Sequence, residues 1–372
     1  MIRVGAVLSL SGPFAAQGVA AARGLTLWAE DVNAGGGFAV ADRGGRWQVA
    51  LTFRDDAGRS RDAAAGAEQL LSEERVDLLM GPYSSVLLLA VAPIAERHGR
   101  VLWNHGGASD EVSRRGFRYV VNIASPASRY FVGLLEMTRA CDPSARRVAL
   151  LHRPRGTFAP AVAAGAAAHA RRAGLDVVLE APYPTSPAEF APLVGRVAGA
   201  RADVVLGAGR TDDDLHLAGQ LRARPMGARV LGLVAAAVGL FRDALGEAAE
   251  GFFGPSQWEP SAGHRPDAGP TAAEFAARFQ RRFGAEPEYP AAQAYAAGVV
   301  AERCAAAAGS LRDELLRDAA RGLSFATLYG AFALDPGTGE QVGHDLVVVQ
   351  WQHGAKPVVW PPGVADAPPR LG

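Results

Sequence analysis

Residues 1–37 read MIRVGAVLSLSGPFAAQGVAAARGLTLWAEDVNAGGG and combine a short apolar run with an amphipathic segment. The run Val4–Ser9 predicts a buried strand. Ala20–Asn33 carries apolar residues at helical spacing and ends at three glycines, which are frequent at helix C-termini. Because a strand followed by a helix is the first half of a βαβ unit, this stretch predicts a parallel sheet with right-handed crossovers.

The same alternation continues in two sets. In the first set we expect strands at Trp47–Arg54, Val76–Met80 and Arg100–Asn104, and helices at Ser60–Ser72, with Ser60 as N-cap, and around Pro93–His98. In the second set we expect strands at Arg147–Leu151, Asp176–Glu180, Asp203–Leu206 and Arg229–Leu233, and helices at Ala159–Ala173, Pro187–Gly199 and Asp212–Arg224. The sequence therefore predicts an α/β fold with two doubly wound parallel sheets.

The last third of the chain departs from this alternation. It predicts helices at Thr271–Phe283, Ala291–Ala308 and Leu311–Arg321. A hairpin is expected from Ala331–Asp335 and His344–Trp351, around the turn residues 336–339, and the Pro-rich tail Pro361–Gly372 is expected to fray.

Composition excludes several classes of function. The length of 372 residues allows two or three domains or one large α/β domain, and a hydrophobic content of 49% is enough for a buried core. Lys+Arg and Asp+Glu both number 38. A nucleic-acid binder would show a basic excess, so we expect no nucleic-acid partner. No run approaches the roughly 18 apolar residues of a membrane span, so we expect no direct membrane insertion. Because Lys356 is the only lysine, single arginines carry less functional weight than usual.

The N-terminus already reads as a strand and shows no secretory leader. Either the natural protein is cytoplasmic, or a start Met stands in place of its leader.

Cofactor and metal motifs do not fit this chain. Gly207-Ala208-Gly209 resembles half of a dinucleotide fingerprint, but Asp212 stands where the third glycine belongs, which favours an ordinary strand–helix turn. Asp55-Asp56 and Asp212–Asp214 lack calcium-loop spacing, and the second cluster suits the capping of a helix start. Cys141 and Cys304 lie far apart, so we expect neither a metal nor a cofactor.

Two loops after predicted strands suit ligand binding. Tyr83-Ser84-Ser85 and the segment 104–110, with its two glycines and Ser109, each precede a helix start. Helix N-termini and glycine-rich loops present N–H groups to anions, although these serines would also serve as plain helix caps. His105 has no partner placed by the sequence, so metal binding or general-base action is weakly supported. The coincidence of several such loops favours an anion-binding site.

Several of these segments together resemble one family. They are Ser9-Leu10-Ser11-Gly12-Pro13, Gly18, Asn33–Gly37, Asp55-Asp56, Gly81 with Ser84-Ser85, Gly106–Ser109, Gly330-Ala331-Phe332, Asp335, Gly339 and Val349-Gln350-Trp351. In order and spacing they are similar to the leucine/isoleucine/valine-binding proteins, the type I periplasmic solute-binding proteins of ABC importers. Each motif is loose, but the likeness spans nearly the whole chain.

The resemblance implies two doubly wound lobes joined by three crossovers, with the ligand in a cleft between the lobes and hinge closure on binding. The crossovers are expected near Asn122–Ser125, Gly251–Pro255 and Gly330–Phe332. Lobe I would be 1–122 plus 252–330, and lobe II 123–251 plus 331–372.

The resemblance also implies ligand-binding residues. In the first lobe they are Ser84, Ser85, Gly106, Gly107, Ala108 in place of the usual threonine, Ser109, and Gln17 in place of a tyrosine. In the second lobe Phe158 would cover the ligand, Arg210 stands where an aromatic is common, and Ala236 stands where a glutamate usually binds the ligand's ammonium. Trp258 would either line the cleft or pack at the hinge.

A buried ammonium without a carboxylate partner costs several kcal/mol, so the change to Ala236 with Arg210 nearby favours an anionic or neutral ligand. Amino acids, 2-oxo acids, aromatic or aliphatic carboxylates and amides stay open. The expected function is that of a monomeric extracytoplasmic binding protein that delivers a small carboxylate-bearing metabolite to ABC permease subunits. The alternative is a cytoplasmic amide or amino-acid sensor of the same fold, and an enzyme is less favoured because no nucleophile–base spacing occurs.

Overall fold

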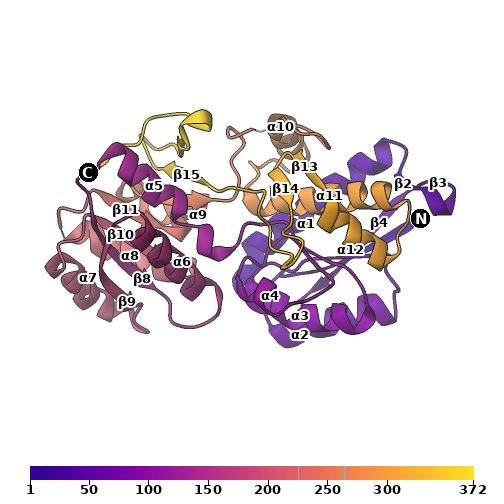
Figure 1. Ribbon diagram of the computed structural model, residues 1–372, viewed down its shortest axis with the longest axis horizontal. Helices are drawn as coiled ribbons and strands as arrows, with labels where there is room; N and C mark the ends of the chain where they lie inside the picture. The colour runs from indigo at the N-terminus through magenta and orange to yellow at the C-terminus, as the bar shows by residue number, and fades with distance from the viewer. Residues whose placement is uncertain (225, 264) are drawn as a thin grey trace. The chain divides into compact units, whose positions relative to one another are not determined.

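The computed structural model describes residues 1–224, 226–263 and 265–372. The chain divides into two compact units, each made of separate stretches of sequence (Figure 1). Unit 1 comprises Met1–Pro126 and Gly263–Asp345, and unit 2 comprises Ala127–Ala262 and Leu346–Gly372.

Unit 1 is built on a five-stranded parallel sheet with the strand order β4-β1-β5-β6-β7. Its strands are β1 (Ile2–Leu8), β4 (Val49–Asp55), β5 (Leu78–Met80), β6 (Leu102–Asn104) and β7 (Val120–Asn122), with two small hairpins, β2 (Phe38–Val40) with β3 (Gly45–Trp47) and β13 (Ser324–Thr327) with β14 (Gly330–Ala333). Its helices are α1 (Ala15–Ala34), α2 (Ser60–Ser72), α3 (Ser85–His98), α4 (Glu111–Arg114), α10 (Ala272–Phe283), α11 (Tyr289–Ala308) and α12 (Asp313–Gly322).

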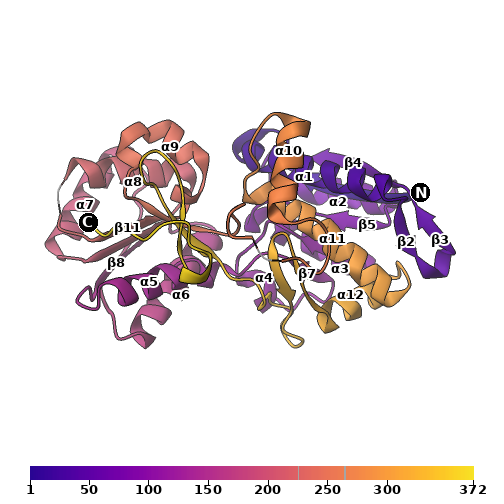
Figure 2. The same cartoon turned by 90° about the horizontal axis from the view of Figure 1, so that it is seen from above.

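Helices cover both faces of the unit 1 sheet. Helices α2 and α3 pack together on one face through apolar side chains such as Leu70, Leu88 and Val91. Helices α1 and α11 run side by side on the other face, as Figure 2 shows. They approach closely because Gly24 faces the α11 backbone: a Cβ at this position would lie 2.2 Å from the carbonyl oxygen of Ala291.

Unit 2 carries a seven-stranded sheet with the order β16-β15-β12-β11-β10-β8-β9. The strands β8 (Arg147–His152), β9 (Asp176–Pro182), β10 (Val204–Ala208), β11 (Val230–Leu233) and β12 (Phe253–Ser256) are parallel, and β15 (Val347–Gln350) and β16 (Val358–Trp360) add antiparallel at one edge. The helices are α5 (Val132–Cys141), α6 (Phe158–Arg172), α7 (Phe190–Gly199), α8 (Thr211–Ala223) and α9 (Gly239–Leu245).

The structure confirms the α/β class and the parallel strands predicted for both sets. Helix α2 has the predicted bounds, but its N-cap is Arg59, and Ser60 is the first helical residue. The divisions between units follow Pro126, Ala262 and Asp345, whereas the sequence placed them after residues 122, 251 and 330. The last division falls later because β14 pairs with β13 inside unit 1.

The predicted C-terminal hairpin is wrong. Strand β14 pairs with β13 across the two-residue turn Leu328-Tyr329, and β15 lies in the unit 2 sheet between β12 and β16. The glycine-rich turn after Asp335 is real, because the Asp335 carboxylate accepts hydrogen bonds from the N–H groups of Gly337 and Thr338, but it closes only an isolated bridge between Leu334 and Gln341.

The C-terminal tail is also more ordered than predicted. The side chain of Gln350 accepts a hydrogen bond from the Arg370 N–H at 2.9 Å and donates to the Arg370 carbonyl at 2.7 Å. The N–H of Gly372 then donates to the Arg229 carbonyl, so buried glutamine and strand-edge groups fix a segment whose composition suggested fraying.

Candidate functional site

The carboxyl ends of three neighbouring strands define the site in unit 1. Strands β1, β5 and β6 are adjacent and parallel, so the loops after Leu8, Met80 and Asn104 meet at one edge of the sheet. A parallel bridge between Tyr83 and Gly106 joins two of these loops directly. Ligands of open α/β sheets bind at such an edge. We call Ser84, Ser85 and Gly106–Ser109 the serine–glycine cluster.

Asn104 holds the glycine loop in shape. Its side-chain oxygen accepts hydrogen bonds from the N–H groups of Gly106 at 3.2 Å and Gly107 at 2.7 Å. Its amide nitrogen donates to the Gly107 carbonyl and to the Asn122 side chain, both at 2.8 Å. The loop glycines therefore use their N–H groups internally, and these groups do not stand free for a ligand in this structure.

The two neighbouring serines differ sharply. Ser85 is buried, and its Oγ accepts a hydrogen bond from the Ser109 N–H at 2.9 Å, so it ties α3 to the glycine loop. Ser84 is the N-cap of α3, and its φ of +78° is a strained conformation for a residue with a side chain. Its Oγ is buried and has no hydrogen-bond partner among the described residues. Ser84 thus keeps a polar group whose bonding capacity is unused.

His105, at the same edge of the sheet, also has unused hydrogen-bonding capacity. Its side chain is fully buried, and neither ring nitrogen has a hydrogen-bond partner in the described part of the chain. Burial lowers the pKa of His105 to about 4, so the ring is neutral at pH 7 and carries one donor and one acceptor nitrogen. No group of three or more potential metal ligands occurs within residues 1–224, 226–263 and 265–372, so His105 is not part of a metal cluster there.

Gln17 and Tyr83 lie in the same unit. The side-chain oxygen of Gln17, in the first turn of α1, is buried without a partner in the described structure. The hydroxyl of Tyr83 lies 2.5 Å from the hydroxyl of Tyr289, at the start of α11, and burial raises the pKa of Tyr83 to about 12. Tyr83 therefore links the strand-edge loop to α11 as a neutral phenol.

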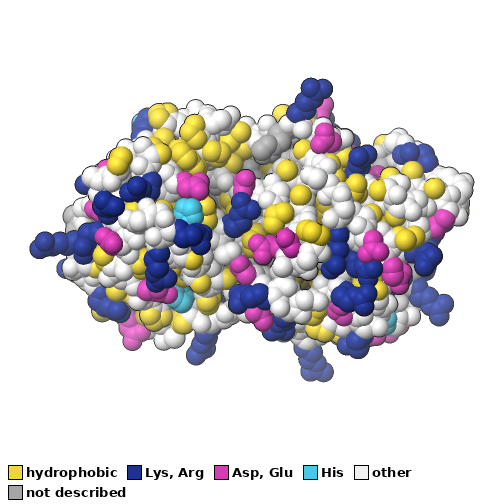
Figure 3. Space-filling view, in the orientation of Figure 1, with side chains coloured by type: hydrophobic (Ala, Val, Ile, Leu, Met, Phe, Trp, Pro, Cys, Tyr) yellow, Lys and Arg dark blue, Asp and Glu magenta, His cyan; other side chains and the backbone are white. Residues whose placement is uncertain are grey.

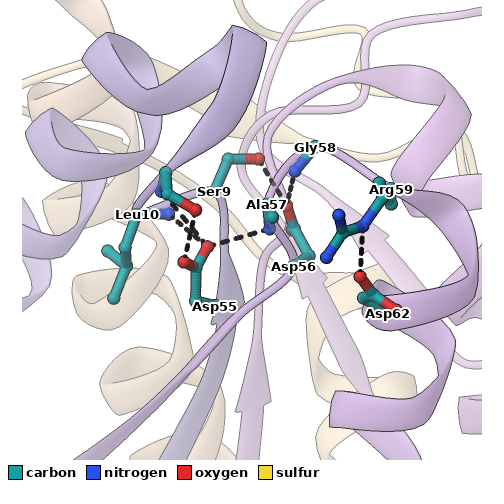
Figure 4. A network of polar contacts seen from close by, with 9 residues as sticks. Ser9, Leu10, Asp55, Asp56, Ala57, Gly58, Arg59 and Asp62 are labelled. Carbon is teal, nitrogen blue, oxygen red and sulfur yellow. Dashed lines mark hydrogen bonds and ion pairs between the residues drawn. The ribbon is translucent and has the colours of Figure 1, made fainter.

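The paired aspartates Asp55 and Asp56 act as structural connectors (Figure 4). Asp55 accepts hydrogen bonds from the N–H groups of Leu10 and Ala57, and Asp56 accepts one from the Ser9 hydroxyl at 2.6 Å. Burial raises the pKa of Asp56, whereas for Asp55 the hydrogen bonds outweigh burial and lower the pKa. These residues fasten the end of β1 to the end of β4, while the second carboxylate oxygen of Asp56 is buried without a hydrogen-bond partner among the described residues.

Arginines mark the carboxyl edge of unit 2. Strands β8 and β10 are neighbours, with His152 opposite Ala208, so the segment after β8 and Arg210 after β10 lie at one edge. Arg153 forms an ion pair with Asp213 at 2.8 Å, while Arg210 is exposed at the start of α8. Phe158, the first residue of α6, is half-buried and packs edge-on against Tyr130, with ring centroids 5.0 Å apart.

Side chains from other elements hold the loop that contains Ala236. We call this loop, η5 (Val234–Ala237), the alanine loop. Asp214 accepts a hydrogen bond from the Ala235 N–H at 2.9 Å, Trp351 Nε1 donates to the Ala236 carbonyl at 3.0 Å, and Lys356 Nζ donates to the Ala237 carbonyl at 2.5 Å. Ala236 itself is fully buried. The loop has no polar side chain of its own and is a fixed, uncharged surface.

Asp214 corrects one expectation. The sequence assigned Asp212–Asp214 to helix capping, but the Asp214 side chain is fully buried and accepts a second hydrogen bond, from the Tyr183 hydroxyl at 2.7 Å. Burial raises the pKa of Asp214 to about 7. It connects α8 to the alanine loop, whereas Asp213 fulfils the capping role by accepting from the Arg210 N–H at 3.2 Å.

The structure thus brings together part of the predicted set of ligand-binding residues. The serine–glycine cluster comes together in unit 1, which also contains Gln17, whereas unit 2 contains Phe158, Arg210, Ala236 and Trp258. Trp258 is buried within unit 2 beside Ser256, whose Oγ donates to the Trp258 carbonyl at 2.9 Å.

Sequence reasoning missed Asn104, Asp214, Trp351 and Lys356 as residues that shape these loops. An asparagine between a strand and a glycine pair was a usable signal for Asn104, because asparagine side chains commonly bond to the backbone of a following turn.

The surface and the helices add two observations. On the face shown in Figure 3, basic and acidic side chains alternate without a large region of one sign. In the described ranges, no helix combines the length and the apolar character that crossing a membrane requires.

Comparisons with known proteins agree on one family. A family model described as "Periplasmic binding protein" matches residues 1–356. A "Leu/Ile/Val-binding protein homolog 8" of Brucella abortus is 25% identical over 298 residues, which are 77% of this chain and 71% of the relative.

Solved structures share the fold at lower identity. A Streptococcus pneumoniae branched-chain amino acid transporter substrate binding protein in complex with isoleucine has a TM-score of 0.79 at 19% identity, covering 97% of this chain and 100% of its own. An ABC transporter solute binding protein of R. palustris in complex with benzoate has a TM-score of 0.78 at 18% identity, covering 99% of this chain and 96% of its own. Within one fold, such proteins hold different small ligands.

Proposed function

The chain belongs to the periplasmic binding protein family, which consists of solute-binding proteins and not enzymes, and we propose that it captures a small carboxylate-bearing molecule for an ABC importer. In this proposal the protein works outside the cytoplasm as a monomer, changes the arrangement of its two units on binding, and delivers its ligand to permease subunits. The observation that carries the binding role is the buried Ser84 hydroxyl at the carboxyl edge of three parallel strands, which has no hydrogen-bond partner among the described residues.

The proposed anchor for the carboxylate lies in the serine–glycine cluster. A carboxylate accepts hydrogen bonds and gives none, so it suits the Ser84 hydroxyl and the N–H groups at the start of α3. Gly106 and Gly107 are proposed to contribute close backbone approach, since their N–H groups already bond to Asn104. Ala108, Ser109 and Gln17, which lies in the same unit, complete the proposed anchor.

The ligand is proposed to lack an ammonium group. The alanine loop offers no carboxylate, and the carboxyl of Asp214 behind it is already bonded to Tyr183 and Ala235. Arg210 is exposed at the same edge of unit 2 and is proposed to add a positive charge, with Phe158 covering the ligand. Aliphatic, aromatic and 2-oxo acids fit this description better than zwitterionic amino acids do.

A thermal-shift panel tests this function. Isovalerate, 2-oxoisocaproate, benzoate, leucine and isovaleramide are compared on the wild type, on Arg210→Ala, and on Arg171→Ala as a matched control at an exposed site of α6. At about 100 times its dissociation constant, a ligand adds roughly 2.7 kcal/mol of stability. We expect a shift with one or more acids that Arg210→Ala reduces and Arg171→Ala retains.

The outcomes separate the parts of the proposal. A shift with leucine alone would contradict the exclusion of an ammonium but keep the binding role. A shift that Arg210→Ala leaves unchanged would remove Arg210 from the site. No shift with any acid, amide or amino acid of the panel would count against the proposed ligand class.

A further inference from the structure

Unit 1 contains a cavity that shares no residue with the serine–glycine cluster. It has a volume of about 470 Å³ and lies among the C-terminal half of α1, the middle of α11, the start of α10 and the β2–β3 hairpin. Five charged side chains line it: Asp31, Arg46, Glu274, Arg278 and Glu302. We call it the charged cavity.

Three of these charges are already used inside the unit. Arg278 forms an ion pair with Asp31, and the Tyr295 hydroxyl donates to the second oxygen of Asp31 at 2.7 Å. Glu274 accepts hydrogen bonds from both the N–H and the hydroxyl of Thr271, at 2.8 and 2.9 Å, in the capping box of α10. These groups are structural and gain little from a ligand.

Glu302 and Arg46 are the two charged residues of the cavity that are not yet accounted for. Glu302 accepts one hydrogen bond, from Trp28 Nε1 at 3.0 Å, and it has no ion pair in the described part of the chain. A carboxylate has room for about four hydrogen bonds, so most of its capacity is unused. Burial raises the pKa of Glu302, while the positive charge of Arg46 acts in the opposite direction.

Arg46 lines the same cavity as Glu302 and carries the opposite charge. It is exposed on β3 and likewise forms no ion pair with a described residue, although its charge reaches Glu302. A ligand with only a positive charge would be repelled by Arg46, and a ligand with only a negative charge would be repelled by Glu302 and Asp31. A ligand with one positive and one negative group can pair with both Glu302 and Arg46.

We propose that the charged cavity is a second binding site, for a small molecule that carries an ammonium group at one end and a carboxylate at the other. The ammonium donates to Glu302 and the carboxylate accepts from Arg46, with Trp28 and Tyr295 forming the apolar walls between them. This site is independent of the function proposed above, because none of its residues belongs to the loops that carry that function.

Titration with a matched set of five-carbon probes tests the proposal. The probes are 5-aminopentanoate with both charges, pentylamine with the ammonium alone and pentanoate with the carboxylate alone. The readout is the indole N–H resonance of Trp28, assigned with Trp28→Phe, because this group donates directly to Glu302. We expect 5-aminopentanoate to shift this resonance saturably, with a dissociation constant about tenfold lower than either partner probe, the effect of one charge-assisted hydrogen bond.

Variants identify the two ends. Glu302→Gln keeps an acceptor for Trp28 but removes the charge, and Arg46→Gln removes the opposite charge; each should weaken 5-aminopentanoate about tenfold. Ser84→Ala lies in the other site and should leave this titration unchanged.

Equal affinity for pentylamine and 5-aminopentanoate would overturn the proposal, as would an absent shift. Unchanged or tighter binding of 5-aminopentanoate by Arg46→Gln would also overturn it, because Arg46 would then not bind the carboxylate of the probe.

Discussion

Replacing Ser84 should stabilise the ligand-free protein and weaken ligand binding at the same time. Most substitutions at a buried hydroxyl destabilise a protein, because they orphan the partner of that hydroxyl. The Ser84 hydroxyl has no partner in the described structure, so its removal orphans nothing. The predicted gain in stability therefore comes from removing a buried hydroxyl that is left unbonded until a ligand binds.

The magnitude follows from two features of Ser84. Removing a buried, unbonded hydroxyl recovers a desolvation cost of about 1–3 kcal/mol, so Ser84→Ala should raise the free energy of unfolding by about 1 kcal/mol or more. Ser84→Gly should add the strain of a φ of +78°, about 1–3 kcal/mol, less about 0.5–1 kcal/mol for the greater freedom of glycine in the unfolded chain. Both variants should lose about tenfold in ligand affinity, the effect of one hydrogen bond.

The assay is urea denaturation of the ligand-free variants together with calorimetric titration of the acid found in the ligand panel. Ser85→Ala is the matched control, because its Oγ accepts from the buried Ser109 N–H and its loss should destabilise the protein by about 1–3 kcal/mol. If Ser84→Ala lowered the free energy of unfolding as Ser85→Ala does, the hydroxyl would have an internal partner, and the assignment of Ser84 as a ligand anchor would fail.

Three further predictions concern pH, the alanine loop and helix packing. Burial raises the pKa of Asp214 from 3.8 to about 7, so between these values the folded chain binds a proton that the unfolded chain has released. The free energy of unfolding should therefore fall by about 3 kcal/mol from pH 4 to 7, and urea melts of Asp214→Asn should lack this slope. Trp351→Phe should cost about 1–3 kcal/mol in urea melts, since it leaves a buried carbonyl of the alanine loop without its donor, and no loss would show that this bond is dispensable. Gly24→Ala should cost about 1–3 kcal/mol because its Cβ meets the α11 backbone. Gly219→Ala in α8, where an added Cβ would have no described atom within 4 Å apart from the adjacent residues and the helix's own backbone, should be neutral or stabilising by up to about 1 kcal/mol, and equal effects would contradict the packing argument.

Much of the fold was predictable because local periodicity and tertiary burial agree in this chain. Val4–Ser9 was predicted as a buried strand, and β1 is almost completely buried. The hairpin β13–β14 was missed because its turn, Leu328-Tyr329, contains none of the usual turn residues, whereas the glycine-rich stretch after Asp335 gave a stronger but misleading signal.

The residues that shape the site were less predictable, since their roles depend on distant parts of the chain. Asp214 stands in a run of three aspartates, and its burial and its contacts with Tyr183 and Ala235, 31 and 21 positions away, distinguish it from its neighbours. The alanine loop carries no polar side chain, so nothing in its own sequence indicates that Trp351 and Lys356 hold its carbonyls.

The segments that carry the family resemblance contain both groups that the fold uses and groups that it leaves unused. Asp55 and Asp56 contributed to the likeness, and their hydrogen bonds fasten β1 to β4, which is a requirement of the fold whatever the ligand. Ser84 and Ser85 are the same residue type in adjacent positions, yet among the described residues the Oγ of Ser85 has a hydrogen-bond partner and the Oγ of Ser84 has none. A ligand can only use bonding capacity that the fold leaves unused, so within such motifs specificity is better sought among the unpartnered buried groups than among the bonded ones.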